Sequence, residues 1–176
     1  EKMELVDFGE HSYQKLLDAE TSIVEQKINA IGTVVYTEES KAKIEAARAA
    51  YNALTDAQKS AVSQTYVKEL TDAESNYETL RNTAITNAIT KISEIGTVEY
   101  TDESKAKIDA ARAKFNLILE ADQASVTNKA TLLAAEAAYA TLKADHDAAE
   151  LVDEKILAIG DVAYTAESKA KIDDAN

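Results

Sequence analysis

Three potential metal ligands stand together in the chain at Asp145, His146 and Asp147. Side chains at consecutive positions of a helix point about 100° apart, so these three cannot converge on one ion. The second histidine, His11, is equally isolated, and the sequence has no cysteine to act as a thiolate ligand or a nucleophile. We therefore expect no bound metal and no cofactor.

Carboxylates are the other groups with catalytic chemistry, because the chain has 32 acidic against 19 basic residues and a net charge of −13. A glycosidase needs two carboxylates that face each other across a cleft. Here several carboxylates lie at expected helix starts, where they have a role in complementing the helix dipole: Glu38, Glu39, Asp102, Glu103 and Glu167. The sequence also has no calcium-binding loop, glycine-rich phosphate loop or G-x-S-x-G elbow. We predict that the protein is not an enzyme and has no catalytic residue.

Tyrosines recur at one position of a repeated motif, as Tyr36, Tyr100 and Tyr164. Exposed rings at a fixed spacing would bind a glycan by stacking on its sugar rings. The alternative is that each ring fills the corner between two helices of its own bundle and that its hydroxyl bonds to a local partner. We favour the second interpretation, because each tyrosine follows the same turn sequence.

The motif belongs to an internal repeat of 64 residues, with starts at positions 27, 91 and 155. The sequence KINAIGTVVYTEESKAKI recurs as KISEIGTVEYTDESKAKI and again as KILAIGDVAYTAESKAKI. A second block, Leu-x-x-Ala-Glu-x-x-Tyr-x-x-Leu, occupies 70–80 and 132–142, with a fainter copy over 6–16. The repeat predicts four segments: the end of a preceding repeat over 1–26, full repeats over 27–90 and 91–154, and a truncated repeat over 155–176.

Each copy of the motif contains the signals that end one helix and start the next. A glycine follows an amphipathic run, where a positive φ ends a helix, and a threonine precedes acidic residues, as a helix N-cap does. Together with the three tyrosines, these residues are expected to have structural roles: Gly32, Gly96 and Gly160, and Thr37, Thr101 and Thr165.

Apolar residues recur at helical spacing between these signals. Thr55–Gln58 has the form of a capping box, which predicts a short helix ending near Val62. No breaker separates the second block from the next motif, which predicts unbroken helices over about 66–95 and 130–159; the alternative is a kink near Asn82–Thr83. With no Pro and four Gly, a β-sandwich or barrel is disfavoured. We predict an all-α fold of tandem three-helix bundles, joined by continuous linker helices into an elongated rod.

The repeat length, the three-helix organisation and the signature Tyr-Thr-x-Glu-Ser-Lys-Ala-Lys-Ile resemble the tandem FIVAR-type modules of large secreted and wall-attached proteins of Gram-positive bacteria. The uninterrupted helix is also similar to that of the longer spectrin repeat. This resemblance implies an extracellular or cell-wall-attached protein. It also implies a spacer between anchors and other domains, and some such modules adhere to host proteins.

The expected function is a non-catalytic stalk, and the alternative is an adhesin-type module that binds a host protein or glycan through an exposed helix face. The acidic surface disfavours nucleic acid, and no apolar run approaches the roughly 18 residues of a membrane span. The expected partners are neighbouring repeats of the same chain. Weak head-to-tail self-association is a further expectation, because residues 1–17 resemble a third helix without its partners and the segment from Val152 resembles a helix pair without its third.

Overall fold

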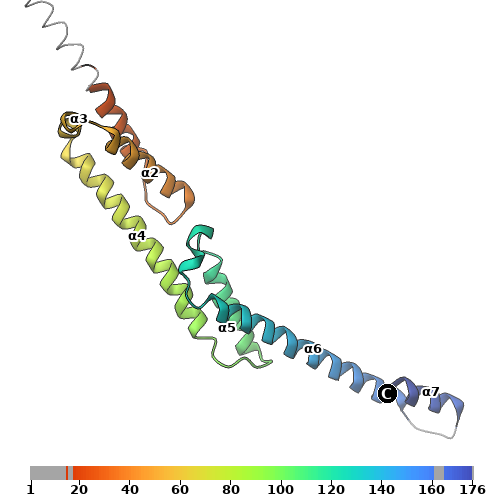
Figure 1. Cartoon of the computed structure of the whole chain (residues 1–176). Helices are drawn as coiled ribbons and strands as arrows, with labels where there is room; N and C mark the ends of the chain where they lie inside the picture. Colours follow the sequence, from red (N-terminus) through yellow and green to blue (C-terminus); the bar gives the residue numbers. More distant parts are fainter. Residues whose placement is uncertain (1–14, 16–17, 161–164, 176) are drawn as a thin grey trace, which may run out of the picture. The chain divides into compact units, whose positions relative to one another are not determined.

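The computed structural model describes residue 15, residues 18–160 and residues 165–175, and every regular element in this part of the chain is a helix. The all-α prediction is therefore confirmed. Helical residues 18–29 come first. They are followed by α2 (Glu38–Ala53), α3 (Asp56–Ala61), α4 (Gln64–Ser93), α5 (Asp102–Phe115), the 3-10 helix η1 (Glu120–Ser125), α6 (Lys129–Ile159) and α7 (Ala166–Ala175), as Figure 1 shows.

Three of these helices begin in the same way because the sequence Thr-x-Glu-Ser recurs. The threonine hydroxyl accepts a hydrogen bond from the backbone N–H of the serine three residues later, which satisfies one of the free donors of the first turn. The distances are 3.2 Å for Thr37 and Ser40 at α2 and 3.2 Å for Thr101 and Ser104 at α5. At α7 the Thr165 hydroxyl accepts in the same way, at 3.1 Å.

The glycine of each motif lies soon after the end of a helix and has a positive φ: 63° at Gly32, 66° at Gly96 and 60° at Gly160. A side chain at such a position would be strained, because Cβ crowds the backbone there. The short helix α3 also begins as expected, since Thr55 and Gln58 form a capping box and Val62 caps its end. Local signals therefore set most helix boundaries.

Contacts group the described chain into two units. The first contains the residues up to Ile85 together with Ile118–Asp122, and the second contains Thr86–Leu117 together with the residues from Gln123 onward. The core of the first unit comes from helical residues 18–29, α2 and the first half of α4. Its largest buried members are Val24, Ile28, Ile31, Ile44, Leu54, Val62, Leu70 and Tyr77.

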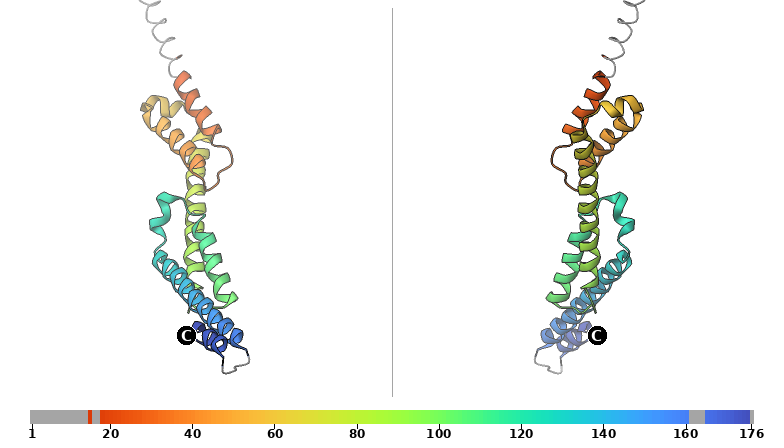
Figure 2. Two further views of the ribbon diagram at one scale, coloured as in Figure 1. Left: turned by 90° about the vertical axis from the view of Figure 1, so that its right-hand side faces the viewer. Right: turned by 90° about the vertical axis from the view of Figure 1, so that its left-hand side faces the viewer.

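The core of the second unit uses the equivalent elements one repeat later. Its buried apolar residues are Ala88, Ile92, Ile95, Ile108, Ala111, Phe115, Val126, Leu132 and Ala135. Helix α5 lies beside the first part of α6 (Figure 2), and α7 runs back along the last part of α6 (Figure 1). Lys155 on α6 donates a hydrogen bond to the carbonyl oxygen of Asp174 on α7, at 2.9 Å.

Helices α4 and α6 are the long elements, with 30 and 31 residues. Helix α4 is continuous from Gln64 to Ser93, so the alternative of two helices separated near Asn82–Thr83 is wrong. The helical spacing of the block over 70–80 predicts that Leu80 shares one buried stripe with Leu70 and Tyr77, and this prediction is wrong, because 39% of Leu80 is exposed. Periodicity alone placed Leu80 on the stripe, but the core of the first unit ends one turn earlier, at Tyr77.

Candidate functional site

The first motif places Tyr36 at the corner between helical residues 18–29 and α2. Val34 and Tyr36 pack on the core of the first unit, while Val35 between them is 48% exposed. The Tyr36 ring lies 5.8 Å from the ring of Tyr77 on α4, at an interplanar angle of 53°. The ring therefore fills the corner of its own unit.

The hydroxyl of Tyr36 has a distant partner, which corrects the expectation of a local one. It donates to Oδ2 of Asp122, 86 residues away, at 2.7 Å, and it accepts from the backbone N–H of Leu119 at 3.3 Å. Both partners belong to the Ile118–Asp122 segment of the first unit. Asp122 occupies the repeat position of Gln58 (58 + 64), which is also buried, but the uncharged glutamine gives no sequence signal of an ion pair.

Asp122 is the centre of this cluster and is 8% exposed. Its second carboxylate oxygen accepts a hydrogen bond from Nε of Arg81 at 2.7 Å, and Arg81 also pairs with Glu78 at 3.0 Å. We call Tyr36, Arg81 and Asp122 the Asp122 cluster. It joins the helix corner, α4 and the Ile118–Asp122 segment within the first unit.

The two acids of the Asp122 cluster are shifted in opposite directions. Burial by itself raises the pKa of Asp122, but the hydrogen bonds from Tyr36 and Arg81 and the charges of Arg81 and Lys41 outweigh burial and leave this pKa below its usual value. Burial and the hydrogen bond to Asp122 raise the pKa of Tyr36 to about 12. At neutral pH the cluster therefore holds a carboxylate, a phenol and a guanidinium.

A second arrangement occurs once in each unit and was missed from the sequence. Arg48 on α2 binds Glu74 on α4 through two hydrogen bonds, of 2.6 and 2.7 Å. One repeat later Arg112 on α5 binds Glu136 on α6, at 2.6 and 2.5 Å. Such forked pairs fix geometry as well as adding energy. The sequence contained a signal, because both partners recur. The two arginines are 64 residues apart (112 − 48), and the two glutamates are 62 residues apart (136 − 74).

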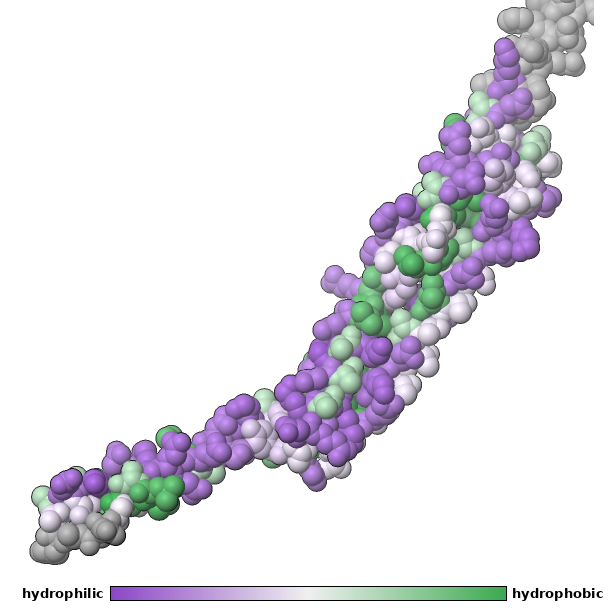
Figure 3. Space-filling model, turned by 180° about the vertical axis from the view of Figure 1, so that it is seen from behind, coloured by the Kyte–Doolittle hydropathy of each residue, from purple (hydrophilic) through white to green (hydrophobic). Residues whose placement is uncertain are grey.

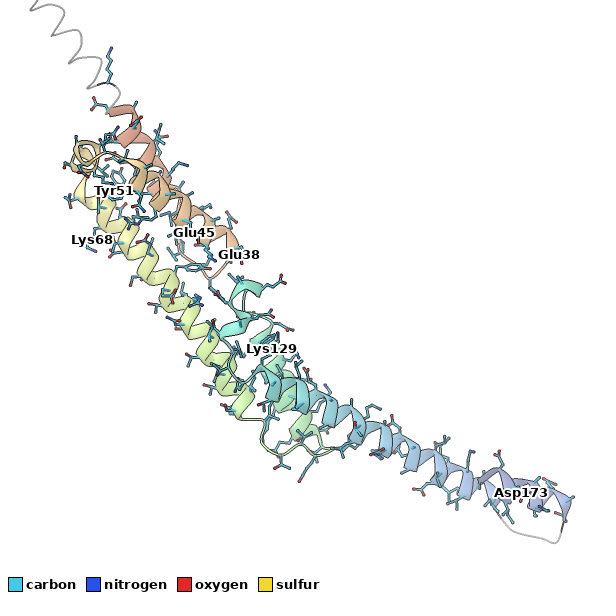
Figure 4. All side chains as sticks on the ribbon, viewed as in Figure 1. Glu38, Glu45, Tyr51, Lys68, Lys129 and Asp173 are labelled. Carbon is cyan, nitrogen blue, oxygen red and sulfur yellow. The ribbon has the colours of Figure 1, made fainter. Side chains whose placement is uncertain are left out.

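Each forked arginine also lies over an aromatic ring at the end of its helix. The guanidinium of Arg48 is 5.4 Å from the ring centre of Tyr51, which is labelled where α2 faces α4 in Figure 4. The guanidinium of Arg112 is 5.3 Å from the ring of Phe115, and the ammonium of Lys129, also labelled there, is 5.2 Å from the same ring. The two arginine contacts lie within a single helix, whereas the contact of Lys129 joins α6 to α5.

In the second unit Tyr100 has a more open position than Tyr36. Its ring lies 5.5 Å from Tyr139 and 4.7 Å from His146, edge to face with the imidazole, and 37% of Tyr100 is exposed. His146 therefore packs on a tyrosine, and Asp147 pairs with Lys143 at 2.6 Å. Tyr164 lies outside the described residues. Across the described residues no group of three or more His, Asp or Glu is placed to hold a metal ion.

Open grooves lie on the first unit, and two of them border α4. One, of about 610 Å³, runs between the end of helical residues 18–29, the corner and α4, with Asn29, Asp72 and Asn76 in its lining. The other, of about 450 Å³, runs between α2 and α4 over the Arg48–Glu74 pair and the Asp122 cluster. Tyr77 lines the second groove, and its buried hydroxyl has no hydrogen-bond partner within the described chain. Most charged side chains that line the second groove form ion pairs with each other, and these pairs hold the helices together.

Comparisons of the chain with family models, with curated proteins and with solved structures give no match. The helices of the described chain include none that is long and apolar enough to cross a membrane. The face in Figure 3 is mostly hydrophilic, in keeping with the acidic composition.

Proposed function

We propose that the chain is a non-catalytic structural stalk, in which tandem three-helix bundles joined by continuous helices form a semi-rigid rod. The observation that carries this proposal is the course of α4 and α6. The repeat starts at Lys91 and Lys155 lie inside these helices, so that each helix continues from one repeat into the next without a break. A helix of about 30 residues extends roughly 45 Å, which is long for a connection between small domains.

The repeated contacts support the same role. Both units use a forked arginine–glutamate pair between their second and third helices, a tyrosine at the helix corner and a threonine cap at the start of the second helix. A protein that serves as a spacer needs its units to repeat the same packing, since stability then grows with each neighbour added. We also propose that the stalk is extracellular or attached to the cell wall, which the resemblance to surface modules of Gram-positive bacteria supports.

Small-angle X-ray scattering of the 176-residue chain tests the rod. Bundles about 15 residues tall and stacked end to end give a length of roughly 80–100 Å, and such a rod has a radius of gyration of roughly 25 Å or more. A compact globule of the same length has a radius of gyration of about 16 Å. A value near the compact one would refute the stalk.

The alternative is an adhesin-type module, and one observation favours it: the Tyr100 ring is 37% exposed. A ring in that position is available for stacking on a sugar. A glycan array and a pull-down from serum and matrix proteins test this alternative. Binding that is lost in Tyr100→Ala but kept in Tyr36→Phe would support the adhesin, and binding unaffected by Tyr100→Ala would remove its basis.

A further inference from the structure

The groove between α2 and α4 contains polar groups that have no partner within the described chain. The groove has a volume of about 450 Å³, and every residue that lines it belongs to the first unit. The forked pair of this unit and the Asp122 cluster use most of its charges in ion pairs. Three of the remaining groups form no hydrogen bond or ion pair among the described residues: the ammonium of Lys41, the carboxylate of Glu45 and the hydroxyl of Tyr77.

The hydroxyl of Tyr77 is a buried donor without an acceptor. Tyr77 is 7% exposed, and its ring packs on Tyr36 while its hydroxyl bonds to no described residue. Burial raises the pKa of Tyr77, and the charge of Asp122 raises it further, so the hydroxyl is protonated at neutral pH. Nearly all buried polar groups in folded proteins have a partner, because an unsatisfied one costs folding free energy. A ligand group that accepts this hydrogen bond is therefore favoured.

Lys41 differs from the equivalent lysines of the later repeats. Lys105 is exposed and pairs with Asp109, four residues later, at 2.6 Å, and the third copy forms the equivalent pair at the same distance. Lys41 is instead half-buried and lines the groove, and it forms no ion pair with Glu45, the acid four residues later. Glu45, which is labelled on α2 in Figure 4, lines the same groove. The first copy thus holds one cation and one carboxylate that its sister copies pair internally.

We propose that this groove binds a small zwitterion of the amino-acid type, whose carboxylate accepts hydrogen bonds from Lys41 and Tyr77 and whose ammonium donates to Glu45. Lys41 and Glu45 lie one turn apart on the same face of α2. The carboxylate and the ammonium of an α-amino acid are separated by one carbon, so both of these long side chains can reach one ligand molecule. The lining carries four carboxylates against three cationic side chains, which disfavours a ligand with a second carboxylate.

The position of the Tyr77 hydroxyl limits the size and the affinity of the ligand. Neighbouring atoms cover this hydroxyl, so a ligand must be small and a side chain beside it must move. Lys41 can move, because its ammonium has no hydrogen bond to break within the described chain. Since the groove is open, we expect dissociation constants in the millimolar range. This inference goes beyond the stalk and does not depend on it, because it concerns one face of the first unit.

Titrations followed by two-dimensional ¹H–¹⁵N NMR test the binding, with L-alanine as the probe. Acetate and methylammonium are the matched controls, because each carries only one of the two charged groups of L-alanine. L-Alanine should produce saturable shifts of the amide signals of Lys41, Glu45 and Tyr77. Acetate and methylammonium should each bind about tenfold more weakly or less, since each loses one set of charged contacts.

Variants then assign the binding to the proposed groups. Tyr77→Phe removes only a hydroxyl that has no partner, so the chain should stay folded, and it should weaken L-alanine binding about tenfold. Lys41→Met should weaken it by a similar factor, while the control Lys105→Met removes the equivalent lysine one repeat later and should leave it unchanged. A wild-type chain without saturable shifts, acetate that binds as tightly as L-alanine, or Tyr77→Phe and Lys41→Met variants that bind as wild type does would overturn the proposal.

Discussion

Replacing Asp122 by asparagine tests whether the Asp122 cluster stabilises the first unit. The carboxylate accepts hydrogen bonds at 2.7 Å from both Tyr36 and Arg81 and is 8% exposed. Asparagine has about the same size, but it removes the charge and turns an N–H₂ group toward one of the two donors. A hydrogen bond to a charged group contributes about 1.5–3 kcal/mol, so we expect Asp122→Asn to lower the free energy of unfolding by about 2–3 kcal/mol.

The coupling between Tyr36 and Asp122 gives this prediction its specificity. Tyr36→Phe removes the donor and should cost about 1.5 kcal/mol alone. In the Asp122→Asn background the same change should cost about 1 kcal/mol less, because the charge-assisted bond is already lost. Urea unfolding followed by circular dichroism measures the free energies, and amide hydrogen exchange at Ile44 and Leu70 assigns the loss to the first unit, where both are core residues.

Glu39→Gln is the matched control, because it makes the same carboxylate-to-amide change in an exposed pair with Lys43 in the first turn of α2 and should lower the unfolding midpoint only slightly. The pH dependence adds a second check. The pKa of Asp122 is lower in the folded chain, so its stabilisation is present above about pH 4 and is lost as the pH falls through the folded pKa. The difference between wild type and Asp122→Asn should therefore close in acid. Additive losses for the two substitutions, or a loss as small as that of Glu39→Gln, would refute the reasoning.

Three further predictions concern α4, a glycine and alkaline pH. Ala84→Pro should lower the free energy of unfolding by about 3 kcal/mol or more and split thermal unfolding into two calorimetric transitions. The control Ala84→Ser should keep a single transition, and a single transition in the proline variant would contradict the role of α4. Gly96→Ala should lower the free energy of unfolding by about 1 kcal/mol through backbone strain alone, because a Cβ at this position has no atom within 4 Å. Gly96→Asn should lower it less, because asparagine tolerates a positive φ better, and thermal melts measure both variants. Since the pKa of Tyr36 is raised to about 12, its contribution to stability is fully present below about pH 10 and lost as the pH rises through 12. Absorbance titration should show a late phenolate step that Tyr36→Phe removes, and an unchanged titration would count against the hydrogen bond to Asp122.

The elements that sequence reasoning located correctly depend on short-range signals. The capping box at Thr55 and Gln58 and the outward position of Val35 are confirmed, because each is decided by residues within a few positions. The unbroken course of α4 followed from the absence of any breaker between Leu80 and Ile95. In each case the physical cause of the structure is local in the sequence.

The candidate site was harder to predict because its contacts are long-range. Asp122 meets Tyr36 across 86 positions, and the repeat concealed the contact because the equivalent residue in the first copy is an uncharged glutamine, Gln58. Arg48 and Glu74 are 26 positions apart and join two helices. The periodicity of apolar residues does not determine how these two helices are rotated relative to each other. Leu80 was misplaced for a similar reason, since a continuous apolar stripe does not mark where one core ends.

The most direct test of the stalk is a distance measured along α4, the helix on which the proposal depends. The chain has no native cysteine, so Lys68→Cys and Thr90→Cys create two unique sites for spin labels at exposed positions of this helix. Across these 22 residues (90 − 68) an unbroken helix rises roughly 33 Å. Double electron–electron resonance should give one narrow distribution near that distance. A broad distribution, or a second population at clearly shorter distance, would show a hinge between the repeats and contradict a semi-rigid stalk.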